Sequence, residues 1–390
     1  MPTKNRFHFV IYLALLSIIG FLATDMYLPA FDQMRMDLDT SKQNIAASLT
    51  LFLGGFAIAQ LLWGPISDRY GKPLAITIGL GVFTITSIGI FFTQNIVIFL
   101  ILRMLQAIGA CAAAVSWQAL IIDHYPENKV KNIFASIMPL VALSPALAPL
   151  LGVYILQHWG WKYIFLFLAL LATILIAYTF TLKSNENPTN RKNQTAIDTI
   201  SYISFFKYKN YLGNVIIYAF CSAGFFAWLT GAPFFLKELG YDEAAIGWSF
   251  VPQTIAFIIG GYGYRLISNR VDGKRILPYL LITYSISMVA LLLIAVLTVP
   301  TLTLLLIPFC LMAFTNGATY PIVVTQALQP FKNNSGKASA LQNTLQLGAC
   351  FLASAFVSLF SKNALLATMI VMVCTVFFVA IGYRLSKKKA

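Results

Sequence analysis

The sequence predicts an all-α membrane protein with twelve transmembrane helices in two six-helix bundles. Of its 390 residues, 59% are hydrophobic and only 10% are charged, and the mean hydropathy is +0.78. Soluble domains carry about 25% charged residues, so no soluble core could hide this much apolar surface. Twelve apolar stretches of about 20 residues or more are long enough to cross a bilayer as helices. A polar connection separates the first six stretches from the last six.

The twelve apolar stretches are the elements that we expect to span the membrane. A spanning β-barrel would need alternating strands of about 10 residues, and the sequence has no such pattern. Helices are the only other solution in lipid, because they satisfy every backbone hydrogen bond internally. In chain order, the predicted helices cover Phe7–Ala30, Asn44–Trp63, Leu74–Phe92, Ile96–Leu120, Ile133–Leu156, Tyr163–Leu182, Leu212–Leu236, Ala245–Tyr264, Ile276–Leu297, Thr301–Val323, Ala338–Phe360 and Ala364–Tyr383.

The basic residues predict the orientation of the chain. Of the 27 Lys and Arg residues, 21 lie at the two termini or in the connections after the even-numbered helices. Five lie in the other connections, and Arg103 lies inside a helix. Because cytoplasmic loops carry an excess of Lys and Arg, we expect both termini in the cytoplasm of a multi-pass inner-membrane protein.

The polar connection predicts where the two bundles divide. Ser184–Gln194 is almost entirely polar, as is typical of a linker or a short surface helix. We expect an N-terminal bundle over residues 1–183, a cytoplasmic linker over residues 184–211 and a C-terminal bundle over residues 212–390.

Short matches relate the two halves. Gly20–Ala23 matches Gly224–Ala227, and Gly109-Ala110 matches Gly317-Ala318. These matches support two parallel repeats around an axis along the membrane normal.

Asp25 is the only one of the 13 acidic residues that lies well inside an apolar run. A carboxylate at the bilayer centre costs about 2.5–3.5 kcal/mol on insertion scales. Such a group is retained where it faces a polar cavity or carries a proton. Burial favours the neutral form of a carboxyl group and a nearby cation favours the charged form, so a site that alternates between these environments can bind and release a proton. The alternative is an aspartate that is simply hydrated near the outer mouth of its helix.

Arg103 is the only basic residue inside a predicted helix. We expect it to face the protein interior, because an arginine that faces lipid is costly. It would pair with Asp25 or respond to the charge of Asp25 through polar neighbours. The alternative is a structural role in which it donates hydrogen bonds to backbone carbonyls.

Several other classes of protein are disfavoured. The basic residues are spread over short loops, which argues against nucleic-acid binding despite the net charge of +14. His8, His124 and His158 lie at helix ends without a metal pair or a nucleophile elbow, which argues against an enzyme. The five cysteines have no metal-ligand spacing, and we expect no cofactor or metal. The chain also lacks a filter-like repeat or a charged ring of the kind that channels use.

Four motifs resemble those of the major facilitator superfamily. They are Thr24–Ala30 in helix 1, Gly64–Lys72 after helix 2, Leu102–Ala110 in helix 4 and Ser144–Gly152 in helix 5. The set resembles the drug:proton antiporters of the bicyclomycin and chloramphenicol resistance (Bcr/CmlA) subfamily. Within it, Ser222–Gly231, Tyr320–Val324 and Ala340–Gly348 resemble the enterobacterial branch named for purine ribonucleoside transport.

The resemblance implies alternating access and a proton-coupled antiporter that exports a small solute, with Asp25 and Arg103 in proton coupling. The solute would be a drug such as bicyclomycin or chloramphenicol, or a purine ribonucleoside. A proton-independent uniporter remains the alternative. We expect a monomer whose partners are the small-molecule substrate, protons and the lipid bilayer.

The resemblance also assigns roles in conformational change. The loop after helix 2 would gate the transporter through Gly64, Asp68, Arg69, Gly71 and Lys72. Its aspartate would accept hydrogen bonds from a helix N-terminus in the other half, and its glycines would allow a tight turn and a close approach. In the antiporter motif of helix 5, Pro145, Pro149 and Gly152 would interrupt the helix and let neighbouring helices approach.

Polar and aromatic residues within the helices are candidates for a substrate cavity. Amides and hydroxyls recognise a neutral solute by hydrogen bonds, and flat rings stack on a base. The alternative for each is a hydrogen bond between helices or a place in the lipid-facing aromatic belt. The candidates are Tyr27, Trp117, Gln118, Trp228, Asn316, Gln326, Asn343 and Gln346.

Overall fold

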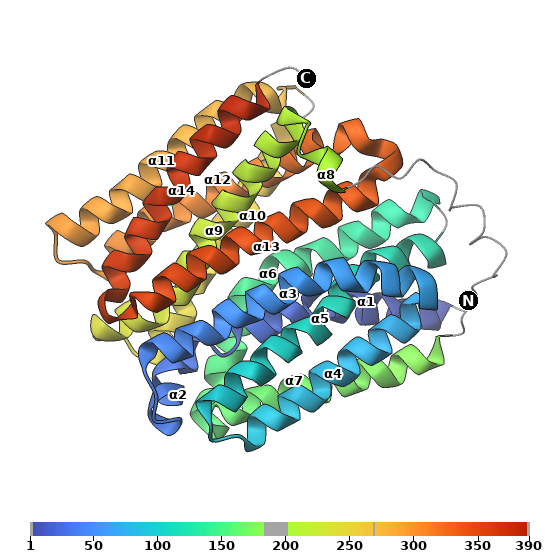
Figure 1. The fold of residues 1–390 in the computed structure, drawn as a ribbon, viewed down its shortest axis with the longest axis horizontal. Helices are drawn as coiled ribbons and strands as arrows, with labels where there is room; N and C mark the ends of the chain where they lie inside the picture. Colours follow the sequence, from blue (N-terminus) through green and yellow to red (C-terminus); the bar gives the residue numbers. More distant parts are fainter. Residues whose placement is uncertain (1–2, 126, 183–201, 268–269, 388–390) are drawn as a thin grey trace. The chain divides into compact units, whose positions relative to one another are not determined.

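The computed structural model describes residues 3–125, 127–182, 202–267 and 270–387. Within these residues, twelve helices are long and apolar enough to cross a membrane, judged by length and composition. This result confirms the predicted all-α membrane fold (Figure 1). The chain separates into two compact units, Met1–Glu186 and Asn187–Ala390.

The first unit contains six spanning helices. Helix α5 packs on α3 and α4, α4 also packs on α7, and α1 packs on α5, α6 and α7. The elements are α1 (Thr3–Asp25), η1 (Leu28–Ala30), α2 (Phe31–Asp37), α3 (Lys42–Tyr70), α4 (Lys72–Phe92), α5 (Ile96–His124), α6 (Glu127–Trp159) and α7 (Lys162–Thr181).

The second unit contains the other six. Helix α9 packs on α12, α13 and α14, and α12 packs on α10 and α11. The elements are α8 (Tyr202–Phe205), α9 (Lys209–Glu238), α10 (Glu243–Ile267), α11 (Gly273–Leu297), α12 (Leu302–Leu328), η3 (Gln329–Asn334), α13 (Ser335–Leu359), η4 (Ser361–Asn363) and α14 (Ala364–Ser386).

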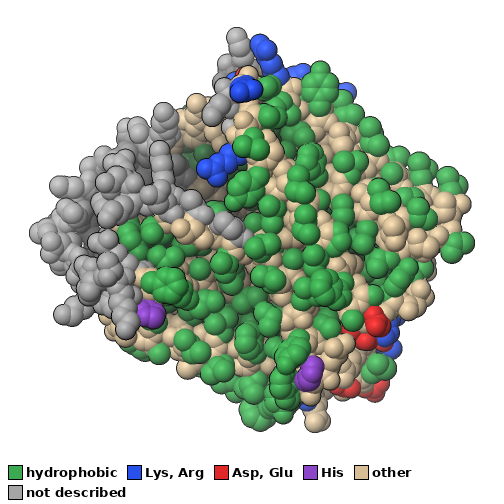
Figure 2. Space-filling model, turned by 180° about the vertical axis from the view of Figure 1, so that it is seen from behind, with side chains coloured by type: hydrophobic (Ala, Val, Ile, Leu, Met, Phe, Trp, Pro, Cys, Tyr) green, Lys and Arg blue, Asp and Glu red, His purple; other side chains and the backbone are tan. Residues whose placement is uncertain are grey.

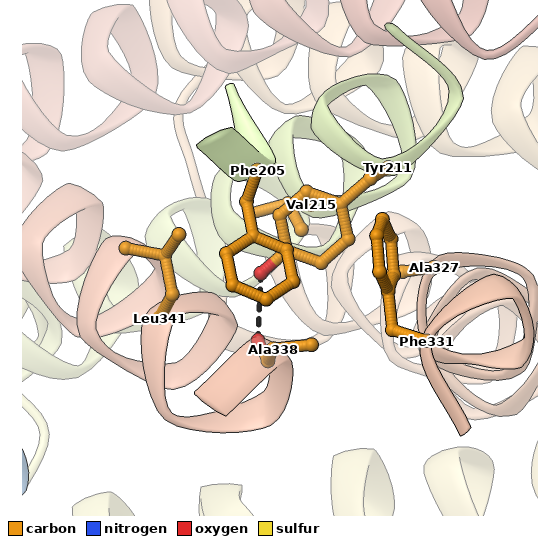
Figure 3. Packing of buried hydrophobic residues seen from close by; sticks show 7 residues of the cluster. All are labelled: Phe205, Tyr211, Val215, Ala327, Phe331, Ala338 and Leu341. Carbon is orange, nitrogen blue, oxygen red and sulfur yellow. Dashed lines mark hydrogen bonds between the residues drawn. The ribbon is translucent and has the colours of Figure 1, made fainter. Parts of the chain in front are cut away.

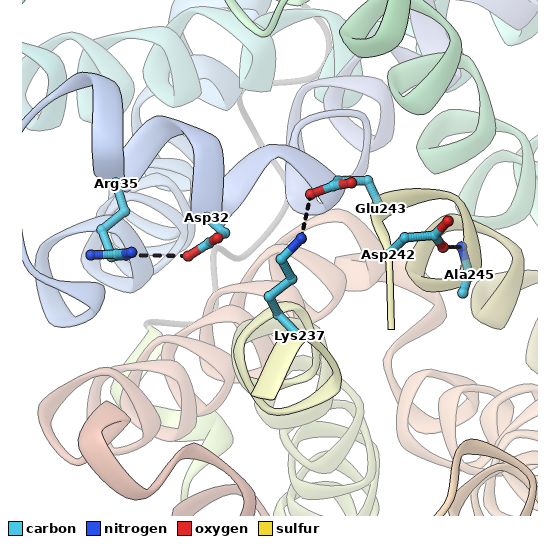
Figure 4. Close-up of polar contacts among 6 residues, drawn as sticks. All are labelled: Asp32, Arg35, Lys237, Asp242, Glu243 and Ala245. Carbon is cyan, nitrogen blue, oxygen red and sulfur yellow. Dashed lines mark hydrogen bonds and ion pairs between the residues drawn. The ribbon is translucent and has the colours of Figure 1, made fainter. Parts of the chain in front are cut away.

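Several helix ends are set by short polar side chains. Ser41 caps α3 by accepting from the Asn44 amide at 3.2 Å, and Asn95 caps α5 in the same way. Asp242 accepts from the Ala245 amide at 2.7 Å near the start of α10 (Figure 4). These bonds satisfy backbone donors that the first turn of a helix leaves free.

The surface of the molecule fits a lipid environment. Figure 2 shows hydrophobic side chains over much of the face that is not grey, while most of the charged side chains in view lie near its edges. Large apolar residues such as Ile85, Leu170 and Phe377 are more than half exposed. Exposed apolar area on this scale would be a liability in water and is expected in a bilayer.

The predicted linker, residues 184–211, lies largely outside the described residues. Its described end is part of the second unit, because the Phe205 ring from α8 is fully buried against Tyr211 and Phe331 (Figure 3). The Tyr211 hydroxyl donates to the Ala338 carbonyl oxygen at 2.6 Å and so joins α9 to α13. The full cluster consists of Phe205, Tyr211, Val215, Ala327, Phe331, Ala338 and Leu341.

Replacing Phe205 by alanine is expected to destabilise the second unit. The substitution removes a buried ring between three helices and leaves a cavity, which costs about 3–5 kcal/mol. Thermal unfolding of the purified protein in detergent measures the effect as a lower midpoint. The matched variant Phe206→Ala changes a ring that is 47% exposed and should leave the midpoint nearly unchanged. Equal midpoints for both variants would contradict this packing.

Candidate functional site

Asp25 is the last residue of helix α1, and its side chain is buried. The predicted helix continued to Ala30, but the structure ends it five residues earlier. Pro29 explains the break, because a proline ring clashes with the carbonyl four residues before it, here that of Asp25. A short 3-10 turn, Leu28–Ala30, follows. The carboxyl group therefore lies at a backbone break inside a spanning segment.

Arg103 is held by the same segment of chain. Its guanidinium, fully buried on α5, donates through Nη2 to the Ala23 carbonyl oxygen at 3.1 Å. The last carbonyls of a helix have no partner within the helix and carry partial negative charge, so a cation there is favourable. Arg103 thus binds the broken end of α1, two residues before Asp25.

Aromatic rings surround the Arg103 cation. The guanidinium carbon lies 4.3 Å from the Tyr27 ring centroid, 4.5 Å from that of Phe52 and 5.6 Å from that of Phe165. Desolvated cation–π contacts contribute about 2 kcal/mol each, which offsets part of the cost of burying the charge. The Tyr27 hydroxyl is within 3.0 Å of the Ser48 hydroxyl, which ties this ring to α3.

A second polar chain extends from Arg103 to α4. Arg103 Nη1 donates to Gln106 Oε1, and Gln106 Nε2 donates to the Ser87 hydroxyl at 2.7 Å. No ion pair joins Asp25 and Arg103, both of which the structure describes, and the Arg103 Nε atom is buried without a partner. The hydrogen bond to a backbone carbonyl is the arrangement that sequence reasoning gave as its alternative.

Gly152 of helix α6 touches the same break. A Cβ atom on this residue would lie 1.7 Å from the Met26 carbonyl oxygen, so the two backbones are in direct contact. The expectation that Pro145, Pro149 and Gly152 interrupt this helix is wrong, since α6 is helical from Glu127 to Trp159. A proline removes a single hydrogen bond, and a long packed helix can continue through it. In this structure Gly152 instead allows the backbone of α6 to approach the backbone at Met26 closely.

The motif after the second spanning helix is mostly helical, contrary to the predicted loop. Helix α3 continues to Tyr70, so Asp68 and Arg69 belong to its last turn. Only Gly71 lies between α3 and α4, and its φ of 96° favours glycine. Among the described residues of the first unit, no atom outside the helix's own backbone lies within 4 Å of a Cβ built on Gly64. The side chain of Asp68 lies outside the described residues, and Lys72 is half-buried at the start of α4.

The predicted substrate residues are placed in different surroundings. Tyr27 belongs to the Arg103 site, and Trp228 is buried against the Phe309 ring at 3.9 Å. Asn316 is buried and donates to the Cys221 carbonyl oxygen at 3.3 Å. Among the rest, Trp117 is buried, Gln118 is exposed, and Gln326, Asn343 and Gln346 are half-buried.

Sequence reasoning missed several members of the site. Gln106 lies three residues after Arg103 and therefore on the same face of α5, a spacing that would have predicted the contact. Phe52 and Ser48 come from α3, and no local pattern links them to Arg103.

Ionisable groups buried within membrane helices mark ion or substrate pathways, so twelve candidate spanning helices that bury Asp25 and Arg103 fit a membrane transporter. Residues 13–354 match the family model of the Major Facilitator Superfamily. The chain therefore belongs to the major facilitator superfamily, as the four motifs predicted, and is a multi-pass membrane protein.

Curated relatives include named resistance proteins. The chain is 26% identical over 277 residues to a bicyclomycin resistance protein homolog of Haemophilus influenzae, with 70% of each chain covered. It is 24% identical over 363 residues to multidrug resistance protein D of Escherichia coli, covering 91% of this chain and 89% of the relative. It is 38% identical over 163 residues to a chloramphenicol resistance protein of Pseudomonas aeruginosa, covering 41% and 39%.

Solved structures match in fold. A D-xylose–proton symporter gives a TM-score of 0.78 at 16% identity, covering 96% of this chain and 97% of the symporter. At this identity the likeness concerns the fold alone, and it agrees with the predicted major facilitator fold.

Proposed function

We propose that the protein is a proton-coupled antiporter that exports small solutes across the bacterial inner membrane. The observation that carries the proposal is Asp25, a buried carboxyl group at the break in α1. The resistance proteins among the relatives support drug-like solutes of the bicyclomycin and chloramphenicol type and the Bcr/CmlA subfamily. Aromatic and amide side chains within the second unit favour purine ribonucleosides as further candidate substrates.

The coupling would act through the segment Ala23–Tyr27. A neutral Asp25 tolerates burial, whereas an isolated buried carboxylate costs several kcal/mol unless a cation pairs with it. Arg103 is the cation nearest in place to do so, because it already binds the Ala23 carbonyl and stacks on Tyr27, on either side of Asp25 in the sequence. Loss of the proton would draw Arg103 toward Asp25 and away from these partners, which would move the broken end of α1. The protonation state would thereby be linked to conformation.

We also propose that both termini lie in the cytoplasm and that the protein acts as a monomer. The excess of Lys and Arg at the termini and after the even-numbered helices supports cytoplasmic termini. A monomer would then suffice, because the proton site lies wholly within one unit of one chain. The gating roles of Asp68, Arg69, Gly71 and Lys72, together with that of Gly64, remain part of the proposal.

Transport by the purified protein in liposomes tests the function. With an imposed pH gradient, radiolabelled chloramphenicol, adenosine or inosine should accumulate on the acidic side, because protons leave that side as the solute enters it. Collapse of the gradient by a protonophore should stop accumulation. Movement of the same solutes at equal rates with and without the gradient would mean facilitated diffusion and would contradict antiport.

A further inference from the structure

A hydrophobic groove with a volume of about 570 Å³ runs along α7 on the surface of the first unit. One face of α7 lines it, because Tyr163, Leu166, Phe167 and Leu170 stand at positions i, i+3, i+4 and i+7. Side chains from α4 and from the end of α6 line the rest. We call this hollow the apolar groove.

A second hollow, of about 470 Å³, adjoins the apolar groove where α6 and α7 join. Both hollows are lined by Trp159 and Tyr163, so they meet at these two residues. The lining of the second hollow includes two charged residues, Asp37 and Lys162. We call it the polar pocket. The apolar groove therefore ends in a pocket that carries one anion and one cation.

Trp161 contacts both charges of the polar pocket. Its side chain is buried, and its Nε1 atom donates to Asp37 Oδ2 at 2.8 Å. Lys162 Nζ lies 5.6 Å from the centroid of the same ring. No ion pair joins Asp37 and Lys162, both of which the structure describes. Each charge is therefore held beside the indole without neutralising the other.

The junction of the two hollows has the side chains of a membrane–water interface. Trp159 and Tyr163 are exposed, and the Tyr163 ring meets the Phe91 ring edge-on at 5.3 Å. Trp and Tyr gather at this boundary because their rings are amphipathic. Lys162 is the first and only charged residue of α7. The polar pocket therefore lies at the level of the lipid headgroups, and the apolar groove extends from it into the hydrocarbon layer.

The charges of the polar pocket select among lipid headgroups. Hydrocarbon chains are the solvent around a spanning helix, so an acyl chain fits the apolar groove and brings its headgroup to the pocket. The Lys162 ammonium suits a phosphate, and the Asp37 carboxylate suits an ammonium that donates a hydrogen bond. A headgroup with a phosphate and no amine would place its negative charge near Asp37 without compensation. A headgroup that carries both groups matches both side chains.

We infer that the apolar groove and the polar pocket together bind one phospholipid with a zwitterionic headgroup that carries a primary amine, as in phosphatidylethanolamine. One acyl chain lies along α7, the phosphate contacts Lys162, and the ammonium donates to Asp37. The bound lipid is thus a specific ligand of the first unit and not only part of the surrounding solvent. The inference does not depend on the proposed transport function, because it concerns a surface away from Asp25 and Arg103.

Native mass spectrometry of the purified, delipidated protein tests the inference. Three phospholipids with the same acyl chains are titrated separately. Phosphatidylethanolamine has an amine with N–H donors, phosphatidylcholine has a quaternary ammonium without them, and phosphatidylglycerol has no amine. The wild type should retain one phosphatidylethanolamine molecule per chain. It should bind this lipid about tenfold more tightly than the other two, since each of them lacks one charge-assisted hydrogen bond.

Variants of the polar pocket test the headgroup contacts. Asp37→Asn keeps an oxygen that accepts from Trp161 but loses the negative charge, so it should bind phosphatidylethanolamine no better than phosphatidylcholine. Lys162→Ala should weaken binding of all three lipids, because each carries a phosphate. Lys362→Ala is the matched control, since Lys362 is exposed in η4 at the corresponding junction of the second unit, between α13 and α14. It should bind all three lipids as the wild type does.

Variants of α7 test the groove. Leu170→Trp places a larger side chain in the apolar groove and should weaken binding of all three lipids. Ile174→Trp is its control, because Ile174 is similarly exposed one turn further along α7 and does not line the groove. Both side chains are more than half exposed, so the unfolding temperatures should stay near that of the wild type. Equal affinity of the wild type for the three lipids, an unchanged preference in Asp37→Asn, or equal effects of the two tryptophan variants would overturn the inference.

Discussion

Asp25→Asn is expected to reduce gradient-driven transport to the level of liposomes without protein. Asparagine keeps the size of the side chain but cannot exchange a proton near neutral pH. The buried position and the helix break around it are unchanged, so the variant should fold and unfold at the wild-type temperature. Transport of labelled substrate under an imposed pH gradient measures the effect. Because asparagine stays neutral at every pH tested, the rate of substrate movement down its own gradient should not depend on pH in this variant.

Asp32→Asn is the matched control for this variant. Asp32 lies on α2 of the same unit and pairs with Arg35 at 3.2 Å (Figure 4). Both partners are partly exposed, and such pairs contribute at most about 1 kcal/mol. The control should therefore transport at the wild-type rate. Full gradient-driven transport by Asp25→Asn would refute the role of Asp25 in proton coupling.

Gly152→Val is expected to abolish transport and lower thermal stability. Its side chain would enter the space occupied by the Met26 carbonyl, where even a Cβ atom would come within 1.7 Å. Overpacking usually lowers the free energy of unfolding by about 1–3 kcal/mol. Here the obstacle is backbone, which yields less readily than a flexible side chain. Helix α6 would be pushed from the Asp25 break. The measurements are the unfolding temperature in detergent and the gradient-driven transport rate.

Gly81→Ala on α4 provides the comparison for this steric prediction. Among the described residues, no atom outside the helix's own backbone lies within 4 Å of a Cβ atom at Gly81. Alanine is also the better helix former, so the stability of this variant should be kept or slightly raised. Gly152→Ala should fall between Gly81→Ala and Gly152→Val. If Gly152→Val keeps the stability and transport of the wild type, α6 does not contact α1 as described.

The spanning helices could be predicted from the sequence because about 20 apolar residues in a row have few alternatives in lipid. Their ends were less predictable. Helix α3 extends through the polar residues Ser67–Tyr70, which continue the hydrogen-bonding ladder without any apolar signal. The end of α1 at Asp25 could have been predicted, since Pro29 stands four residues later.

The candidate site was only partly predictable. Asp25 and Arg103 stand out in the sequence because they are charged residues in apolar runs. Their surroundings depend on long-range packing, as with the Ala23 carbonyl, which is 80 residues from Arg103.

The most direct test of the central claim follows protons and substrate together. Liposomes containing the purified protein and a trapped pH-sensitive dye start at equal pH on both sides, and chloramphenicol or adenosine is added outside. Antiport predicts that substrate entry expels protons, so the lumen becomes alkaline at a rate that follows substrate uptake, and that Asp25→Asn shows no pH change. Substrate uptake by the wild type with no change in internal pH would contradict the account.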